Sequence, residues 1–384
     1  MTGPHVVVAG GGLAGLSLAV ALLDRRPELP ITVLEPRTRY ADDRTWCFWD
    51  IAPHPFRELI AERWDAWSVT GPGGTAVLRD PATPYARLRA RDVYHHALAR
   101  LASAPNALLR TGMRVTAVAR DHVTTAHGET IAGDVLADAR PPEAADWART
   151  EHPWLWQVFA GARVHAAPGT FDPGTVELMD FGVEQAGEIR FRYVVPRSDT
   201  EALVELTAFS TRGPDPAPVA AALDGALSAR VRDADVGARE QGCIPMTSAP
   251  PPLPAARGVI PLGTRAGAPR PSTGYAFLPI QRHSAAVADA IVAGRPGARP
   301  MRSARARALD RVFLNRLAAD PAGAPELLHR MAARVPAGVF ARFLMERGSP
   351  WDTLRVMAAL PTLPFAWEGL RGLARARTPH PVEP

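Results

Sequence analysis

The stretch VVVAGGGLAGLSLAVALLDRRPELPITVLEP at residues 6–36 decides the fold. Its hydrophobic pattern predicts a strand over residues 5–9, a helix over about residues 13–26 and a second strand over residues 31–35. A glycine-rich turn joins the first strand to the helix. The stretch therefore predicts a βαβ unit at the start of the chain.

Four residues mark this unit as a dinucleotide site. Gly10, Gly12 and Gly15 form G-x-G-x-x-G, in which the first glycine permits the tight turn, the second lets the backbone reach a pyrophosphate, and the third lets helix and strand pack closely. The phosphates would lie at the helix N-terminus, where free N–H groups bind anions. Glu35 ends the second strand about twenty residues after Gly15, where an acid binds the ribose hydroxyls.

The glycine spacing alone does not distinguish FAD from NAD, but the later part of the chain favours FAD. Residues 259–263 predict a last parallel strand that leads into a helix over residues 274–294. This layout resembles the FAD domains of the glutathione-reductase-like group, and it places Gly263 beside the flavin. Hydroxylases of that group often carry Gly-Asp at this point, whereas this chain has Gly263 followed by Thr264.

We therefore expect an α/β fold, in which a glutathione-reductase-like FAD-binding Rossmann domain is interleaved with an antiparallel-sheet substrate domain and followed by a helical C-terminal region. Residues 42–50 are expected to form an irregular aromatic loop, and residues 85–101 a helix. The expected units are FAD-binding segments at residues 1–80, 81–145 and 256–300, a substrate domain at residues 146–255 and a helical region at residues 301–384.

Composition limits the classes of partner. The chain has 384 residues, of which 47% are hydrophobic, and a formal net charge of +5. All 44 basic residues are arginines, scattered along the chain, so we expect no nucleic-acid partner. Cys47 and Cys243 form no metal or redox motif, so we expect neither a metal site nor a disulfide. Since no run of about eighteen apolar residues and no leader occurs, we expect a cytoplasmic protein that does not span a membrane.

Segments in order along nearly the whole chain resemble the bacterial lycopene cyclase family. They are DDRTWCFW at residues 42–49, WQVFAG at 156–161, LMDF at 178–181, YVVP at 193–196, LVELT at 203–207, GCIPM at 242–246, GTRAG at 263–267 and RPSTGYAF at 270–277. The resemblance implies an isomerase, classed as an intramolecular lyase, that closes the linear ends of lycopene into β-ionone rings and gives γ-carotene, then β-carotene. It also implies reduced FAD without net redox change, with NADPH or NADH as the reductant.

Ring closure requires an acid, and Glu205 is the candidate. Protonating a carbon–carbon double bond needs a carboxylic acid that is neutral at working pH, and a dry pocket raises its pKa. Apolar residues flank Glu205 in LVELT, although the alternation equally allows a half-exposed strand with Glu201 and Thr207 on the same face. The resemblance identifies Glu205 with the family's catalytic acid. The next position, acidic in many relatives, is Leu206, which puts in doubt a mechanism with two adjacent carboxylates.

The resemblance also implies roles for the DRTW segment and for several aromatic residues. Asp43 and Arg44 would provide a second carboxylate and an arginine beside the flavin, and the alternative is a surface ion pair. Trp46, Tyr193 and Phe277 would line the substrate pocket and stabilise a cation through their ring faces, although such aromatic residues also form ordinary core.

The run at residues 271–275 is expected to contact the flavin. Its hydroxyl and backbone donors suit the flavin ring or the ribityl chain, and the alternative is an N-capped helix start. The residues concerned are Ser272, Thr273, Gly274 and Tyr275. The position before the run, commonly Lys or His in relatives, is Arg270.

Three other functions share these features: an FAD-dependent monooxygenase or desaturase, a cyclase of another terpenoid, and a non-catalytic carotenoid-binding protein. The sequence leaves open which polyene reacts, whether one or both ends cyclise, and the oligomeric state. Residues 351–377 interleave Leu, Met, Phe and Trp with Arg, a composition that suits either peripheral membrane contact or an ordinary packing helix.

Overall fold

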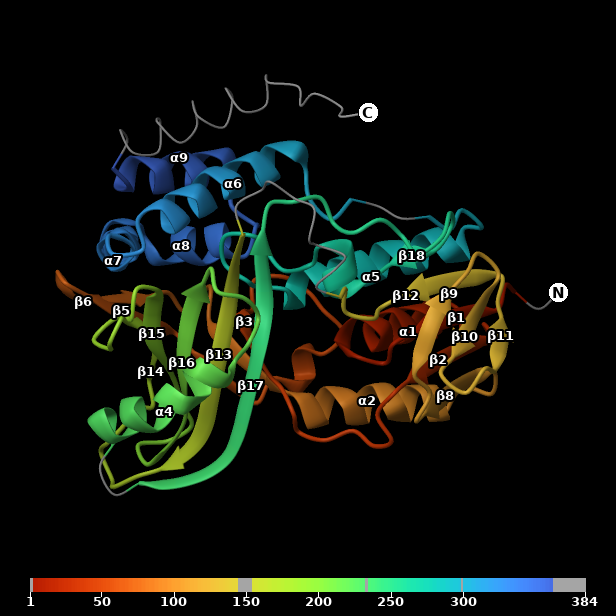
Figure 1. The fold of residues 1–384 in the computed structure, drawn as a ribbon, viewed down its shortest axis with the longest axis horizontal. Helices are drawn as coiled ribbons and strands as arrows, with labels where there is room; N and C mark the ends of the chain where they lie inside the picture. Colours follow the sequence, from red (N-terminus) through yellow and green to blue (C-terminus); the bar gives the residue numbers. More distant parts are fainter. Residues whose placement is uncertain (1–2, 144–153, 232–233, 298–299, 362–384) are drawn as a thin grey trace.

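A five-stranded parallel sheet, in the order β18-β12-β1-β2-β8, organises the N-terminal part of the chain (Figure 1). The computed structural model describes residues 3–143, 154–231, 234–297 and 300–361. The strands are β1 (Val6–Ala9), β2 (Ile31–Glu35), β8 (Ala107–Thr111), β12 (Val135–Asp138) and β18 (Ile260–Pro261). The βαβ unit and the late parallel strand predicted from the sequence are therefore confirmed.

Both faces of this sheet are covered, as in other parallel sheets. Val6 and Val8 face helices, whereas Val7 and Ala9 face a small antiparallel sheet. The helices are α1 (Leu13–Arg25), α2 (Ala90–Ala102) and α5 (Phe277–Val292). The small sheet contains β9 (Val115–Val118), β10 (His122–Thr125) and β11 (Thr130–Ala132).

The second large sheet has seven strands, in the order β17-β13-β16-β15-β14-β5-β6 (Figure 1). Its strands are β5 (Ala66–Gly71), β6 (Gly74–Arg79), β13 (Trp154–His165), β14 (Thr175–Asp180), β15 (Ile189–Pro196), β16 (Glu201–Ser210) and β17 (Asp235–Thr247). Neighbouring strands are antiparallel except β14 and β5. Helix α4 (Ala217–Arg230) packs on one face of this sheet. The strands β5 and β6 thus pair with the expected substrate sheet, and the unit boundaries drawn from the sequence stay predictions.

Helices of the C-terminal region pack against the other face of the large sheet (Figure 1). They are α6 (Ala304–Ala319), α7 (Ala324–Arg334) and α8 (Ala337–Leu344), and α9 (Pro350–Ala359) packs on α7 and α8. Leu327, Leu328 and Met331 of α7 belong to one hydrophobic core with Trp67 and Leu78. Pro336 precedes α8 and Pro350 begins α9, whereas residues 362–384 lie outside the described residues.

Two local predictions are wrong. The expected loop at residues 42–50 contains β3 (Thr45–Trp49), because the aromatic and β-branched sequence TWCFW pairs with β7 (Tyr85–Arg89) in a three-stranded sheet with β4 (Glu62–Trp64). The helix expected from residue 85 begins only at Ala90, since residues 85–89 form β7. Two 3-10 turns, η1 (Arg57–Leu59) and η2 (Gly263–Ala266), complete the described elements.

Candidate active site

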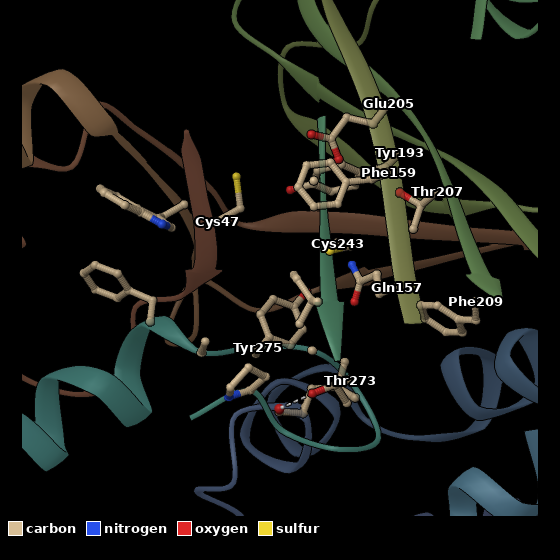
Figure 2. Close-up of a pocket in the computed structure, with 18 of the residues that line it drawn as sticks. Cys47, Gln157, Phe159, Tyr193, Glu205, Thr207, Phe209, Cys243, Thr273 and Tyr275 are labelled. Atoms are coloured by element: carbon tan, nitrogen blue, oxygen red, sulfur yellow. Dashed lines mark hydrogen bonds between the residues drawn. The ribbon is translucent and has the colours of Figure 1, made fainter. Parts of the chain in front are cut away.

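A cavity of about 490 Å³ lies between the seven-stranded sheet, strands β3 and β7, the turn before α5 and helices α6 to α8. Figure 2 shows Glu205 and Tyr193 at one end of the cavity, Gln157 in the middle, and Thr273 and Tyr275 at the other end. Most of the lining is apolar and comes from the sheet and from helices α6 to α8, for example Leu178, Phe191, Leu203, Phe209, Phe313, Met331 and Phe343. Such a cavity suits a hydrocarbon ligand.

Glu205 is a buried acid in the middle of β16. The strand points its odd-numbered residues 203–209 into the cavity, as its two-residue repeat requires (Figure 2). Glu205 is only 9% exposed, whereas Glu201 at the start of the strand is ion-paired at the surface. Burial, and secondarily the charge and hydrogen bond of Glu240, raises the pKa of the Glu205 carboxyl well above its usual range. This shift favours the neutral carboxyl, which is the state that donates a proton.

Leu206 lies on the opposite face of the same strand. It packs with Leu223 and Leu227 of α4 and is 3% exposed. An acid at this position would therefore point toward α4 and away from the Glu205 carboxyl. The departure from the family at Leu206 removes no group from the cavity.

A second carboxyl, which the sequence analysis missed, reaches Glu205 from the edge strand β17. In the sheet register Glu205 lies opposite Gly161 of β13, and Gly161 lies opposite Glu240 of β17. The two carboxyl groups are within hydrogen-bonding reach. Thr45 Oγ1 donates to Glu240 Oε2 at 2.9 Å. A signal was present in the sequence, because Thr45 and Gly161 belong to the family-like segments and Glu240 closely precedes another.

Three tyrosines connect the Glu205 end of the cavity to the turn before α5. Tyr193 lies opposite Glu205 in register, its hydroxyl is 3.0 Å from Tyr85 Oη, and Tyr85 Oη is 3.2 Å from Tyr275 Oη. Burial raises the pKa of all three phenols, so they stay neutral hydroxyls. Cys47 faces the same region, and burial raises the pKa of its thiol to about 12. This end of the cavity therefore holds neutral polar groups within an apolar wall.

The glycine turn occupies the junction of β1 and α1. Gly10 has a φ of +105°, a conformation that glycine adopts without strain. A Cβ on Gly15 would lie 1.9 Å from the Gly10 carbonyl oxygen, so helix and strand pack too closely for a side chain. Gly12 caps α1 without a side-chain hydrogen bond, and a Cβ there would meet nothing within 4 Å. The first N–H groups of α1 thus face open space, as a bound phosphate requires.

Glu35 lies beside this turn at the end of β2 and is 4% exposed. Its Oε2 accepts from the Gly11 backbone N–H at 2.8 Å, and its Oε1 accepts from Arg37 Nε at 2.8 Å. Tyr40 Oη donates to the Gly11 carbonyl oxygen at 2.9 Å. These contacts fix the carboxylate where a ribose is predicted to bind.

Asp43 and Arg44 lie apart from the Glu205 carboxyl. Asp43 accepts from Arg37 Nη1 and from Tyr94 Oη, both at 3.2 Å, and does not line the cavity. Arg44 is exposed, lines the cavity, and donates from Nη1 to the Asp43 carbonyl oxygen at 2.8 Å. The geometry brings Arg44 to the cavity and leaves Asp43 on the nucleotide side, and the functional roles of both stay predictions.

The turn before α5 is fastened to the C-terminal helices. Ser272 Oγ donates to Asp310 Oδ1 at 2.6 Å, and Arg270 Nε donates to the same oxygen at 3.1 Å. Arg270 also donates to the Phe343 carbonyl oxygen, and its guanidinium lies 4.7 Å from the centre of the Phe343 ring. Asp310 is 2% exposed in α6. The Ser272 hydroxyl therefore anchors the turn, while its backbone neighbours face the cavity.

Thr273, Gly274 and Tyr275 line the cavity directly (Figure 2). Gly274 has a φ of +74°, and a Cβ there would lie 2.2 Å from Gln157 Oε1. Gln157 Oε1 is buried and has no hydrogen-bond partner within the described part of the chain. The cavity thus contains an available acceptor beside this turn, which a bound cofactor or substrate could use.

Of the remaining predicted residues, Trp46 and Phe277 line the cavity, whereas Gly263 does not. Gly263 has a φ of +57°, and a Cβ there would lie 2.9 Å from Ala14 Cβ, so the turn η2 approaches α1 closely. Trp46 and Phe277 line the cavity with ring centroids 6.4 Å apart, and Phe277 stacks on Phe48 at 4.3 Å. Within residues 3–143, 154–231, 234–297 and 300–361, no group of three or more metal-ligating side chains could hold a metal ion.

The fold and the glycine turn define an α/β protein with a Rossmann-type dinucleotide-binding domain. The structure is similar to that of a geranylgeranyl bacteriochlorophyll reductase-like protein from Thermoplasma acidophilum, with a TM-score of 0.61, 15% identity, and coverage of 97% of this chain and 100% of that chain. It is also similar to a flavin-dependent brominase, with a TM-score of 0.57, 14% identity, and coverage of 98% and 100%. At these identities the similarity shows the fold alone.

Sequence comparison narrows the class. The profile described as lycopene cyclase protein matches residues 5–368. The lycopene beta-cyclase of Paracoccus sp. (strain N81106 / MBIC 01143) is 30% identical, over 94% of this chain and 95% of the relative. The lycopene beta-cyclase of Pseudescherichia vulneris is 29% identical, over 94% and 96%. The chain belongs to the lycopene cyclase family.

Proposed function

We propose that this chain is an isomerase that cyclises the linear ends of lycopene to β-ionone rings, giving γ-carotene and then β-carotene, with reduced FAD and no net redox change. The observation that carries the proposal is the Glu205 carboxyl, buried at the end of an apolar cavity with its pKa raised. Membership of the family supports lycopene as the substrate. NADPH or NADH would serve only to reduce the flavin.

The cavity residues supply the acid–base chemistry. Glu205 donates its proton to the terminal carbon–carbon double bond, so an O–H bond breaks, a C–H bond forms and a carbocation remains. The next double bond attacks this cation and closes the ring. A ring proton then returns to a carboxylate, so mass and electron count are unchanged. The rings of Trp46, Tyr193 and Phe277 face the cavity and can stabilise the cation by roughly 1–2 kcal/mol each when desolvated.

The residues at the nucleotide end fit FAD. The uncapped N-terminus of α1 and the open space beside Gly12 suit the pyrophosphate, and Glu35 suits the ribose. Thr264, Thr273 and Gln157 provide polar atoms toward the cavity for the remainder of the cofactor. When bound in its reduced state, FAD would supply an electron-rich ring that stabilises positive charge in the cavity.

We expect ring formation to require reduced flavin but to consume no stoichiometric reductant. The purified protein is incubated anaerobically with lycopene and FAD reduced by dithionite, or with FAD and NADPH, and the pigments are separated and weighed by mass spectrometry. Both reactions should give products isomeric with lycopene.

Either of two results would reject this proposal and indicate another function. Oxidation of one NADPH per ring, or a product whose mass differs from lycopene, would indicate a monooxygenase or desaturase. If lycopene stays unreacted while another isoprenoid alkene is cyclised, the protein would be a cyclase of a different terpenoid.

We also propose that the protein docks peripherally on the cytoplasmic membrane face, because water does not deliver a long hydrocarbon. Helix α9 exposes Trp351, Leu354 and Met357 along one side, at 75%, 52% and 51%, with Arg355 beside them. In the described part of the chain, no helix is long and apolar enough to span a bilayer. The predicted segment 351–377 extends into residues outside the described ranges.

Flotation with anionic liposomes tests this docking. We expect the protein to float with the vesicles and the triple variant W351S/L354S/M357S to stay in the soluble fraction. A wild-type protein that remains wholly soluble would leave α9 as an ordinary surface helix.

A further inference from the structure

We propose that Glu240 is a positioning residue for Glu205: the two carboxyl groups form a pair above Gly161 and share one proton, which keeps Glu205 protonated for the reaction. The kinetic part of this inference rests on the proposed function, whereas the proton sharing itself does not. Glu240 supplies a second carboxyl on the cavity face from a different strand, whereas an acid at position 206 would lie on the α4 face.

Strand register makes the pair possible. Glu205 of β16, Gly161 of β13 and Glu240 of β17 form a row across three adjacent strands. Because successive residues alternate between faces, all three positions lie on the cavity face, together with Phe159 and Gly242. Two side chains separated by one intervening strand meet only if that strand leaves room between them.

Gly161 leaves this room. A Cβ at Gly161 would lie 2.6 Å from Glu205 Cγ and 3.4 Å from Glu205 Cβ. The backbone of Gly161 is not among the glycines with positive φ, so no turn geometry requires glycine there. The missing side chain is explained by the Glu205 side chain, whose Cγ fills its place.

The surroundings decide which carboxyl carries the proton. Thr45 Oγ1 donates to Glu240 Oε2 at 2.9 Å, which stabilises an ionised Glu240. Glu240 is half-buried, whereas Glu205 is buried, so the charge costs less on Glu240. Two adjacent carboxylates cannot both ionise easily, and the proton therefore stays on Glu205, which donates to Glu240.

The other groups that face the pair leave this assignment intact. Tyr193 of β15 and Cys47 of β3 are neutral, because burial raises the pKa of both side chains. Arg87 of β7 interacts electrostatically with Cys47 and Tyr193. It donates hydrogen bonds to both carboxylate oxygens of Glu62 at 2.7 Å.

One further cation stands along β13. Arg163, two residues from Gly161, donates to Asp42 Oδ2 at 2.6 Å. Within the described ranges, neither carboxyl of the pair has a salt bridge, so no cation takes the place of the shared proton.

The substitution Glu240→Gln tests the pair. The glutamine removes the neighbouring negative charge and places an amide N–H against the ionised form of Glu205, and both changes lower the pKa of Glu205. The acid works only when protonated, so cyclisation is lost as pH rises through this pKa. We expect the upper pH limit of kcat to move to lower pH by at least about 1 unit.

A second measurement follows the proton without substrate. Infrared difference spectra of the holoenzyme report the carbonyl band of a protonated carboxyl, and the band that disappears in Glu205→Gln belongs to Glu205. As pH rises, this band should disappear at a lower pH in Glu240→Gln than in wild type. The pH of its disappearance should be nearer to wild type in Glu240→Asp and unchanged in Asp235→Asn. Asp235 is the matched control, since it is an exposed carboxylate on the same strand.

The outcomes separate the two proposals. A Glu205 band and a pH limit that are the same in Glu240→Gln and wild type, with equal flavin content, would overturn the pair. A band that shifts as expected in a protein that does not cyclise lycopene would retain the pair and reject the proposed function. If Glu240→Gln loses flavin or secondary structure, Glu240→Asp becomes the deciding variant. Its Glu205 band must then disappear at a lower pH than the band of wild type.

Discussion

Glu205→Gln should lower the rate of cyclisation by at least about 10² to 10⁴, the usual contribution of a positioned acid. Glutamine keeps the size and polarity of the side chain but delivers no proton. The residue is 9% exposed in the middle of β16, far from the glycine turn in the chain, so flavin content should be unchanged. Product formation by chromatography, with flavin absorbance measured on the same sample, checks both statements.

Glu201→Gln is the matched control for this experiment. Glu201 begins the same strand, but it pairs with Arg197 at 3.2 Å and with His165 at 3.7 Å at the surface. An exposed ion pair contributes at most about 1 kcal/mol, so this variant should retain nearly full activity. Equal losses at both positions would mean that strand stability is being measured. A fully active Glu205→Gln would reject Glu205 as the acid.

Gly12→Val should weaken FAD binding at least about 100-fold, because the valine occupies the space that the pyrophosphate needs above the N-terminus of α1. Losing two charge-assisted hydrogen bonds of about 1.5 kcal/mol each accounts for this factor. Gly12 has φ −74° and ψ −172°, an extended backbone that valine adopts, and its Cβ would meet no atom within 4 Å. The apoprotein should therefore fold, and flavin content after purification reports the loss.

Gly15→Val provides the contrast. Its Cβ would overlap the Gly10 carbonyl oxygen at 1.9 Å, so this variant should fail to fold whether or not FAD is supplied. Circular dichroism distinguishes the two glycine variants. Wild-type flavin content in Gly12→Val would show that the N-terminal unit is not the cofactor site.

The sequence predicted what depends on local pattern. The unit at residues 6–36 is continuous, so its strand–turn–helix pattern identified both the sheet and the glycine turn. Glu205 was identified by its apolar neighbours and by the family-like segment around it. The strand β3 was missed because its five residues do not alternate: Phe48 and Trp49 are both buried.

The sequence pattern did not predict contacts between residues that lie far apart in the chain. Glu240 lies in a polar strand whose residues 235–239 are exposed, and only the register through Gly161 brings it to Glu205. Ser272 has the pattern of a cofactor donor, yet its hydroxyl binds Asp310, which follows much later in the chain. Such partners follow from the packing of strands and helices and not from spacing along the chain.

The discontinuous make-up of the parallel sheet has a consequence for synthesis on the ribosome. β1 and β2 leave the exit tunnel first, but β12, which pairs with β1, stays an open edge until Ile260 of β18 has been translated. The helices α6 to α8, which close the cavity, are translated later still. A nascent chain that pauses before residue 304 therefore presents the apolar cavity face of the large sheet to the cytosol, and we expect its yield to depend on chaperones that shield this face.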